Sequence, residues 1–361
     1  MFNHKRFSLI RKRCRLTSKA LAELVGVTPV QITRIERGDN IPKKETIEKI
    51  ATALRYPKDF FFGNDLDELD KDSASFRSMV AMTAKERDAA LAAGSLAYLL
   101  SDWVSERFEL PKPDLLDLGQ ESEPAVAARI LRQHWCLGEQ PIGNMVQLLE
   151  SKGLRVFSLS ENTKNVDAFS CWEKNVPFVF LNTFKTAEHS RFDAAHELGH
   201  LVLHKHGGPK QGRQVEIEAN DFASSFLMPE ADILAKIPCI TSIDQLIYAK
   251  KRWRVSVMAL TYRLKKLGII SERNYRTLCI QLSSYGYRTK EPNEIEREIS
   301  TVWKKVFTDL WNDRITKKDI ASQLNIPVYE IENLVFGLVG LPKQLEESKK
   351  KDKDFLKLKL V

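Results

Sequence analysis

His196-Glu197-Leu198-Gly199-His200 lies inside an apolar run from Phe192 to Leu203, and this stretch decides how the central part of the chain is interpreted. The run predicts a helix, and side chains four residues apart share one face of a helix. The two imidazoles can therefore bind one metal ion, with Glu197 beside a water molecule on that metal. A zinc hydrolase needs this arrangement, in which Glu197 serves as the general base.

The segment from Glu216 to Pro229 supplies what this pattern still lacks. It predicts a second amphipathic helix that ends at the proline. A catalytic zinc site takes three protein ligands and keeps one position open, and Glu216 is the preferred third ligand. Glu218 is the alternative, but it points to another side of the helix. Only the choice of Glu216 also places Asn220 on the metal face, where its amide can orient a ligand imidazole.

These motifs resemble those of a known family. The five residues from His196 to His200, followed by Glu-x-x-Ala-Asn-x-Phe-Ala from Glu216 and by Leu-Met-Pro at 227–229, are similar to the ImmA/IrrE family of metallopeptidases. Val179 to Asn182 and Arg191-Phe192 resemble its upstream elements, whereas Asp193-Ala194 depart from its usual pattern. The resemblance covers about 121–236. It implies a zincin-like fold, one zinc ion and cleavage of a helix-turn-helix repressor.

A second pattern lies between Leu16 and Gly38. Thr17 and Thr28 are suited to cap two successive helices, with Pro29 directly after the second cap and Gly26 in the turn between them. Gly38 is suited to end the second helix. The apolar positions of both helices form one buried face. This arrangement predicts a helix-turn-helix, with the following residues buried: Leu21, Ala22, Val25, Ile32 and Ile35.

The exposed face of the second predicted helix carries side chains suited to base edges and phosphates in a major groove. The stretch 7–62 resembles the Xre family of Cro/CI-type repressors, including its Ile-x-x-Ile-Glu-Arg-Gly segment. Ser18 stands where that family most often has a glutamine that contacts a phosphate. We expect contacts to double-stranded DNA from Ser18, Thr28, Val30, Gln31, Thr33 and Arg34.

Charge is concentrated at the N-terminal end. Residues 1–60 hold 14 Lys and Arg against 6 Asp and Glu, and this excess equals the net charge of +8 of the whole chain. A basic face on a small domain is typical of a nucleic-acid-binding protein, and the stretch from Arg11 to Arg15 is expected to contact phosphates. Alternatively, this stretch is a solvated basic face.

The five cysteines are far apart in the sequence, which indicates reduced thiols and a cytoplasmic protein. No apolar run reaches the length of a membrane span, and the N-terminus lacks the apolar segment of a signal peptide.

The chain divides into five predicted parts. We expect a helix-turn-helix domain at 1–65, a linker with a long helix at 66–120, a metallopeptidase domain at 121–236, a helical region at 237–345 and a Lys-rich tail at 346–361. Short β-like runs at 154–159, 168–171 and 176–181 indicate a small sheet. The predicted fold class is therefore α+β and mostly helical: an all-α N-terminal domain, a helical zincin-like domain with a small β-sheet, and a helical C-terminal region.

One C-terminal segment has two interpretations. The residues from Ile315 to Pro327 look like a first helix and turn, and Val328 to Val335 predict the next helix. They form either a second DNA or partner module, or packing helices and a dimer surface, and the second interpretation is favoured.

Together these patterns predict a DNA-binding transcriptional regulator, expected to act as a homodimer on two half-sites, with a zinc endopeptidase that cleaves a partner protein such as a repressor. The alternative is a catalytically silent sensor or antitoxin with the same fold. The intact Glu197 favours the enzyme.

Overall fold

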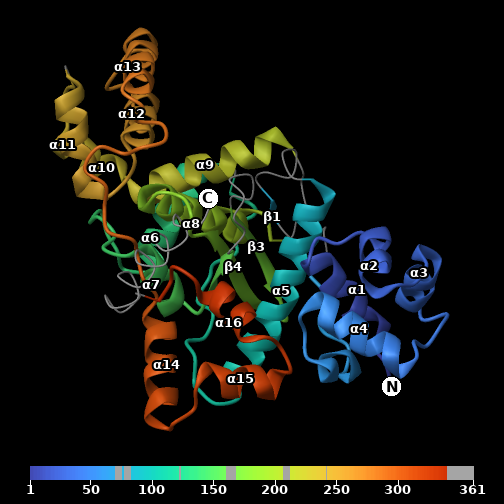
Figure 1. Ribbon diagram of the computed structural model, residues 1–361. Coiled ribbons are helices and arrows are strands. Elements are labelled where there is room, and N and C mark those ends of the chain that lie inside the picture. Colours follow the sequence, from blue (N-terminus) through green and yellow to red (C-terminus); the bar gives the residue numbers. More distant parts are fainter. Residues whose placement is uncertain are drawn as a thin grey trace, which may run out of the picture.

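A computed structural model describes residues 1–69, 75–76, 83–121, 123–159, 168–205, 212–240 and 242–339 of the chain (Figure 1). The predicted Lys-rich tail at 346–361 lies outside these residues. Most of the loop at 207–213, between the two predicted ligand helices, also lies outside them.

The N-terminal domain is a small bundle of helices. Thr17 and Thr28 cap the second and third helices as predicted, each accepting a hydrogen bond from a backbone N–H. Gly26 and Gly38 end these two helices with φ angles of 76° and 79°, which glycine adopts without a steric penalty. The predicted helix-turn-helix is thereby confirmed. Its elements are α1 (His4–Arg13), α2 (Ser18–Val25), α3 (Pro29–Arg37), α4 (Lys44–Leu54) and the 3₁₀ helix η1 (Lys58–Phe62).

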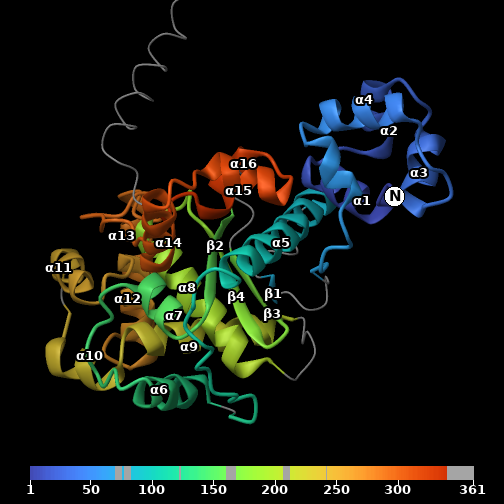
Figure 2. The same cartoon turned by 90° about the horizontal axis from the view of Figure 1, so that it is seen from below.

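The long helix α5 (Ala84–Ser105) joins this domain to the rest of the molecule. It runs from the N-terminal domain to the sheet (Figure 1, Figure 2) and contacts both. Most of its side chains are buried, and many are alanines. Small side chains let neighbouring segments approach closely: a Cβ on Gly94 would lie 2.6 Å from Leu69 Cδ2. The two parts of the molecule are therefore packed on a shared helix.

The central sheet has the strand order β1-β3-β4-β2. β4 pairs antiparallel with β3 and parallel with β2, and Lys174 and Asn175 form the two-residue turn between β3 and β4 with positive φ angles. Three strands correspond to the predicted β-like runs. The strand β1 was not predicted, because two residues are too short to show an alternating pattern. The strands are β1 (Ser75–Phe76), β2 (Arg155–Leu159), β3 (Ala168–Glu173) and β4 (Val176–Asn182).

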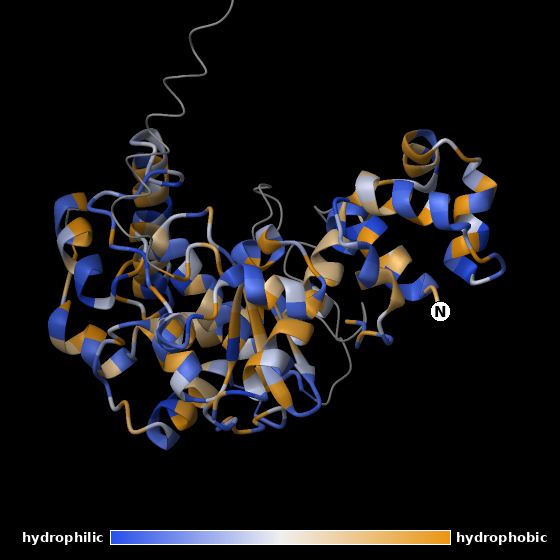
Figure 3. Cartoon of the chain, turned by 60° about the horizontal axis from the view of Figure 1, so that its bottom comes forward, coloured by the Kyte–Doolittle hydropathy of each residue, from blue (hydrophilic) through white to orange (hydrophobic). Residues whose placement is uncertain are grey.

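Helices cover this sheet and complete the central domain. α8 (Ala187–Leu203) packs on β3 and β4, and α9 (Arg213–Leu227) packs on α8. The strands carry many hydrophobic residues, and the surrounding helices combine hydrophobic and hydrophilic residues (Figure 3). Two further helices belong here, α6 (Pro124–His134) against α9 and α7 (Met145–Ser151) against β2. The predicted fold class, α+β and mostly helical, is confirmed.

The C-terminal region is helical, as predicted, and packs back on the central domain. The buried Glu150 accepts hydrogen bonds from the backbone N–H groups of Thr301 (2.9 Å) and Val302 (3.2 Å), where α14 begins. A carboxylate at a helix N-terminus is favourable because the exposed N–H groups there carry partial positive charge. The helices are α10 (Glu230–Lys236), α11 (Ile243–Trp253), α12 (Val257–Lys266), α13 (Glu272–Ser284), α14 (Thr301–Asn312), α15 (Lys317–Leu324) and α16 (Val328–Val335).

Candidate metal centre and DNA-reading helix

The helix α8 carries both histidines of the sequence motif. Thr186 caps it, accepting a hydrogen bond from the backbone N–H of His189. Because α8 lies between the sheet and α9, nearly all of its side chains from Asp193 onward are buried. Gly199 allows the close approach of α9, since a Cβ there would lie 3.0 Å from the Phe222 ring. The motif therefore lies at a tight helix–helix contact.

Three potential ligand atoms converge at this contact. The Nε2 atoms of His196 and His200 are 3.0 Å apart. The carboxylate of Glu216 lies 3.3 Å from the first of these nitrogens and 3.5 Å from the second. Among the described residues these three side chains form a group that could hold a metal ion, with one ligand atom of each within 4.8 Å of the others. The sequence predicted the same three residues.

Asn220 defines the orientation of the first imidazole. Its Oδ1 lies 3.1 Å from His196 Nδ1. An amide oxygen only accepts hydrogen bonds, so this contact places a proton on Nδ1. Nε2 faces His200 and Glu216, and in the neutral ring that a metal ligand requires it carries the lone pair. The donor set of His196, His200 and Glu216 therefore fits a divalent metal ion.

Glu197 directly follows His196 on α8 and is fully buried. The hydroxyl of Ser170, on β3, donates a hydrogen bond of 2.7 Å to its Oε2. The sequence interpretation did not identify Ser170. A small polar residue within the apolar stretch from Ala168 to Cys171 was the available signal, but it did not indicate that β3 packs against α8.

A further histidine lies beside the other imidazole. His204 Nδ1 lies 3.1 Å from His200 Nδ1, and its Nε2 lies 3.0 Å from a carboxylate oxygen of Glu218. Glu218 therefore contacts His204, away from the three converging atoms. The two glutamates of α9 therefore contact different histidines.

The neighbouring thiol is held in its protonated form. Cys171 follows Ser170 on β3, is buried and lies 3.0 Å from the hydroxyl of Tyr98. Burial raises the pKa of Cys171 to about 12. A thiol with so high a pKa is neither a ready metal ligand nor a nucleophile at neutral pH.

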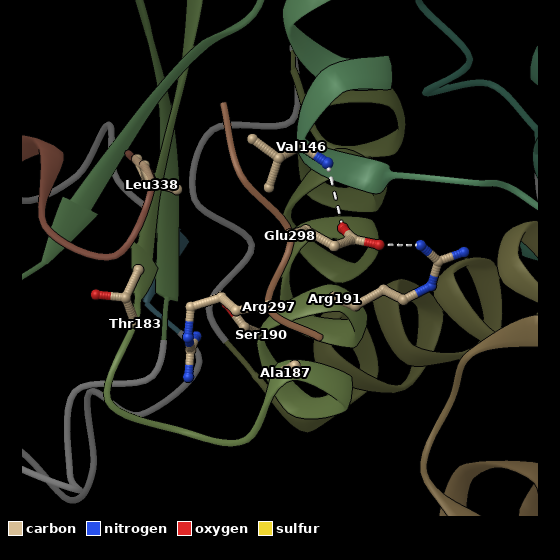
Figure 4. Close-up of a pocket in the computed structure, with 8 residues that line it drawn as sticks. All are labelled: Val146, Thr183, Ala187, Ser190, Arg191, Arg297, Glu298 and Leu338. Atoms are coloured by element: carbon tan, nitrogen blue, oxygen red, sulfur yellow. Dashed lines mark hydrogen bonds and ion pairs between the residues drawn. The ribbon is translucent and has the colours of Figure 1, made fainter. Parts of the chain in front are cut away.

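The N-terminal part of α8 is anchored by a buried ion pair. Arg191 pairs with Glu298, and the other oxygen of Glu298 accepts a hydrogen bond of 2.8 Å from the backbone N–H of Met145. Figure 4 shows this pair at the edge of a small pocket that Thr183 and Leu338 also line. Burial lowers the pKa of Arg191. The pair connects α8 to α7 and to the C-terminal region, and this fixes the helix that carries the candidate ligands.

The helix α3 exposes the residues expected to read DNA. Val30, Gln31 and Arg34 are exposed and Thr33 is half-buried. Thr28 and Gln31 form a capping box, in which Gln31 Oε1 accepts a hydrogen bond from the Thr28 backbone N–H at 2.9 Å. The candidate residues on α3 therefore share one open surface.

Other expected DNA contacts are used within the protein. Ser18 lies 3.4 Å from Glu36, which also binds Arg11 at 2.6 Å. Arg13 forms an ion pair with Glu330 at 3.0 Å. Arg11 and Arg13 therefore each pair with a carboxylate of the protein, and the contact of the stretch from Arg11 to Arg15 with phosphates stays a prediction. Sequence reasoning missed the pairing of Arg13 because Glu330 is distant in the chain.

Comparison with protein families identifies both domains. Residues 8–61 match the helix-turn-helix family model, and residues 149–265 match the model of the IrrE N-terminal-like domain, a metallopeptidase family. The chain therefore joins an Xre-like helix-turn-helix domain to an IrrE-like domain, as the sequence resemblance implied. No curated protein matches the chain. Within the parts of the chain that the structure describes, no helix combines the length and the apolar character needed to cross a membrane.

Proposed function

We propose that the protein is a DNA-binding transcriptional regulator whose IrrE-like domain is a zinc-dependent endopeptidase that cleaves a partner protein, such as a repressor. The single observation that carries the enzymatic part is the convergence of His196, His200 and Glu216, the first of which is followed on α8 by the buried Glu197. Three ligands with a neighbouring carboxylate form the minimum set for a catalytic zinc site.

His196, His200 and Glu216 would hold the ion. When bound, zinc polarises the peptide carbonyl and lowers the pKa of water. Glu197 takes a proton from the attacking water, whose oxygen bonds to the carbonyl carbon. The same proton passes to the amide nitrogen as the carbon–nitrogen bond breaks, which yields a carboxylic acid and an amine that ionise to a carboxylate and an ammonium group.

The neighbouring residues prepare these groups. The Ser170 hydroxyl donates to one oxygen of Glu197, which restrains the carboxylate that receives the proton. Asn220 keeps the Nε2 lone pair of His196 available for the metal. Ser170 lies on β3 and Asn220 lies on α9, so both contacts come from elements other than α8. They support a site that is assembled by the packing of these elements.

The regulatory part of the proposal rests on α3. Its exposed side chains and the basic N-terminal domain suit binding to double-stranded DNA, and a pair of chains would read two half-sites. The structure describes one chain, so dimerisation is a further element of the proposal.

A silent sensor or antitoxin is the second candidate, and one observation favours it. The side chains of His196 and Glu197 are 0% exposed and that of His200 is 5% exposed, whereas Glu216 is 29% exposed. A peptide must reach these atoms before it can be cleaved. A sensor needs only the folded domain with its metal.

Substitution of Glu197 separates the two candidates. The wild type and Glu197→Gln are loaded with zinc and incubated with a library of unstructured peptides, and the products are identified by mass spectrometry. We expect hydrolysis to fall by about 10²–10⁴-fold in Glu197→Gln, because the general base is lost, with the metal content unchanged. Glu218→Gln serves as the control and should keep its activity. Equal cleavage by wild type and Glu197→Gln would contradict the mechanism, and no cleavage by either would favour the sensor.

A further inference from the structure

The helices α15 and α16 repeat the layout of α2 and α3. In the first unit, the cap Thr17 precedes α2, Gly26 follows it in the left-handed conformation, and Thr28 caps α3. In the second unit, Thr316 precedes α15, Asn325 follows it with the same conformation, and Pro327 precedes α16. The separation between Thr17 and Thr316 in the sequence is the same as that between Gly26 and Asn325 and that between Thr28 and Pro327. The cap and turn positions of the two units therefore correspond one to one.

The turn and the core of the two units also agree. The backbone N–H of Val27 donates to the Ala22 carbonyl at 3.0 Å, and that of Ile326 donates to the Ala321 carbonyl at the same distance. Every apolar core position of α2 and α3 is again apolar and buried in the second unit. The core residues of the first unit are Leu21, Ala22, Val25, Ile32 and Ile35. In the same order, the matching residues of the second unit are Ile320, Ala321, Leu324, Ile331 and Leu334. The second unit is therefore a helix-turn-helix by backbone and by core.

The outer face of the second helix differs from that of the first. The positions that carry Val30, Gln31, Thr33 and Arg34 on α3 carry the following residues on α16: Tyr329, Glu330, Glu332 and Asn333. Two carboxylates replace a polar and cationic set. A surface of this kind repels phosphates, so α16 is not suited to DNA.

Glu330, at the position of Gln31, binds the N-terminal domain. Its carboxylate pairs with Arg13 at 3.0 Å and accepts a hydrogen bond of 2.9 Å from the hydroxyl of Tyr56. Glu330 is 2% exposed and Tyr56 is 4% exposed. Burial raises the pKa of Tyr56 well above its ordinary value, and the negative charge of Glu330 raises it further. The Tyr56 hydroxyl therefore remains protonated and acts as a donor. The rings of Tyr56 and Tyr329 meet edge to face, 6.4 Å apart.

The C-terminal end of α16 contacts the central domain. The Thr183 hydroxyl donates to the Phe336 carbonyl at 2.9 Å, and the Phe184 and Phe336 rings stack at 5.1 Å. Gly337 has a φ of 72°, and a Cβ there would lie 2.7 Å from Thr183. Thr183 and Phe184 connect β4 to α8, the helix of the candidate metal centre. One helix therefore contacts both the N-terminal domain and this connection.

We propose that α15 and α16 form a second helix-turn-helix unit that binds protein instead of DNA, and that its partner is the surface of the chain's own DNA-binding domain around Arg13 and Tyr56. This docking fixes the DNA-binding domain against the IrrE-like domain. It leaves α3 accessible, because α3 lies on the side of the N-terminal domain that faces away from α16 (Figure 1, Figure 2).

Substitutions on both sides of the contact test the docking in the full-length chain. Glu330→Met and Arg13→Met each leave the opposite charge buried without its partner, so each should weaken docking. We expect a larger radius of gyration in X-ray scattering and the separation of calorimetric unfolding into two transitions. Glu332→Met, on the same helix with a side chain 52% exposed, is the matched control and should resemble the wild type.

The double variant makes the test independent of the folding of any single variant. Removing both charges leaves neither buried alone, so the chain with Arg13→Met and Glu330→Met should be closer to the wild type in both measurements than either single variant is. If Glu330→Met loses its helical circular dichroism, Arg13→Met and the double variant decide. Wild-type scattering and one transition in both single variants would overturn the docking.

A second arm tests which helix binds DNA. The full-length chain with Gln31→Ala and Arg34→Ala should lose binding to a duplex of mixed sequence at low salt. Residual binding that disappears on further substitution of Asn333→Ala would show that α16 binds DNA and would overturn the proposal. The scattering result does not depend on either proposed activity of the protein.

Discussion

The candidate metal centre and the candidate DNA-reading helix α3 contain similarly few side chains, but they are organised differently. At the metal centre, His196 and Glu197 are buried, and contacts from Asn220 and Ser170 restrain them. On α3, Val30 and Arg34 point into solvent. A catalytic metal site requires preorganised ligands, whereas a DNA-reading face is completed only by its partner. The geometry of the chain therefore supports the first site more strongly than the second.

The contact between Asn220 and His196 should matter for metal and not for DNA. We expect Asn220→Ala to weaken zinc binding by about 10–100-fold, because the imidazole loses the group that orients it. Zinc affinity is measured by competition with a chelator. Gln214→Ala, an exposed change on the same helix, is the control. An unchanged affinity in Asn220→Ala would show that the site does not depend on this contact.

The exposed helix should show the opposite pattern. We expect Arg34→Ala to weaken binding to duplex DNA by about tenfold, within the range of one lost base or phosphate contact, with the zinc content unchanged. Fluorescence anisotropy at fixed salt measures this change. Arg276→Ala, an exposed arginine on α13, should have no effect. Equal effects of both arginines would mean that DNA binding is only a general response to positive charge.

The tight packing between α8 and α9 should make the metal centre sensitive to one methyl group. Gly199→Ala would place a Cβ 3.0 Å from Phe222 Cδ1 and 3.3 Å from Phe222 Cβ. We expect a loss of about 1–2 kcal/mol in the free energy of unfolding, because a well-packed contact tolerates added volume poorly. Urea unfolding measures this change. Gly143→Ala, where a Cβ meets nothing within 4 Å, is the control. Equal stabilities would mean that α9 shifts without cost.

The same contrast explains what the sequence could predict. Helical periodicity determines which residues of one helix share a face. It therefore identified His196 and His200 as one pair, and Glu216 and Asn220 as another. The caps and glycines of α2 and α3 were identified because they act on neighbouring residues. Local rules were sufficient for these features.

Features that depend on distant segments were missed. Ser170 reaches Glu197 only because β3 packs on α8, and Arg13 pairs with Glu330 only because α16 docks beside it. The strand β1 has two residues and no periodic signal of its own. These features depend on tertiary packing, which a single sequence does not display.

Metal content tests the central claim most directly. The purified wild type is compared with Glu216→Ala and Glu218→Ala after zinc is supplied and excess metal is removed. We predict about one zinc ion per chain in the wild type and in Glu218→Ala, because Glu218 contacts His204 and not the three converging atoms, and a loss of bound zinc in Glu216→Ala. A folded wild type without bound metal, or equal zinc in all three proteins, would contradict the assignment of the metal centre.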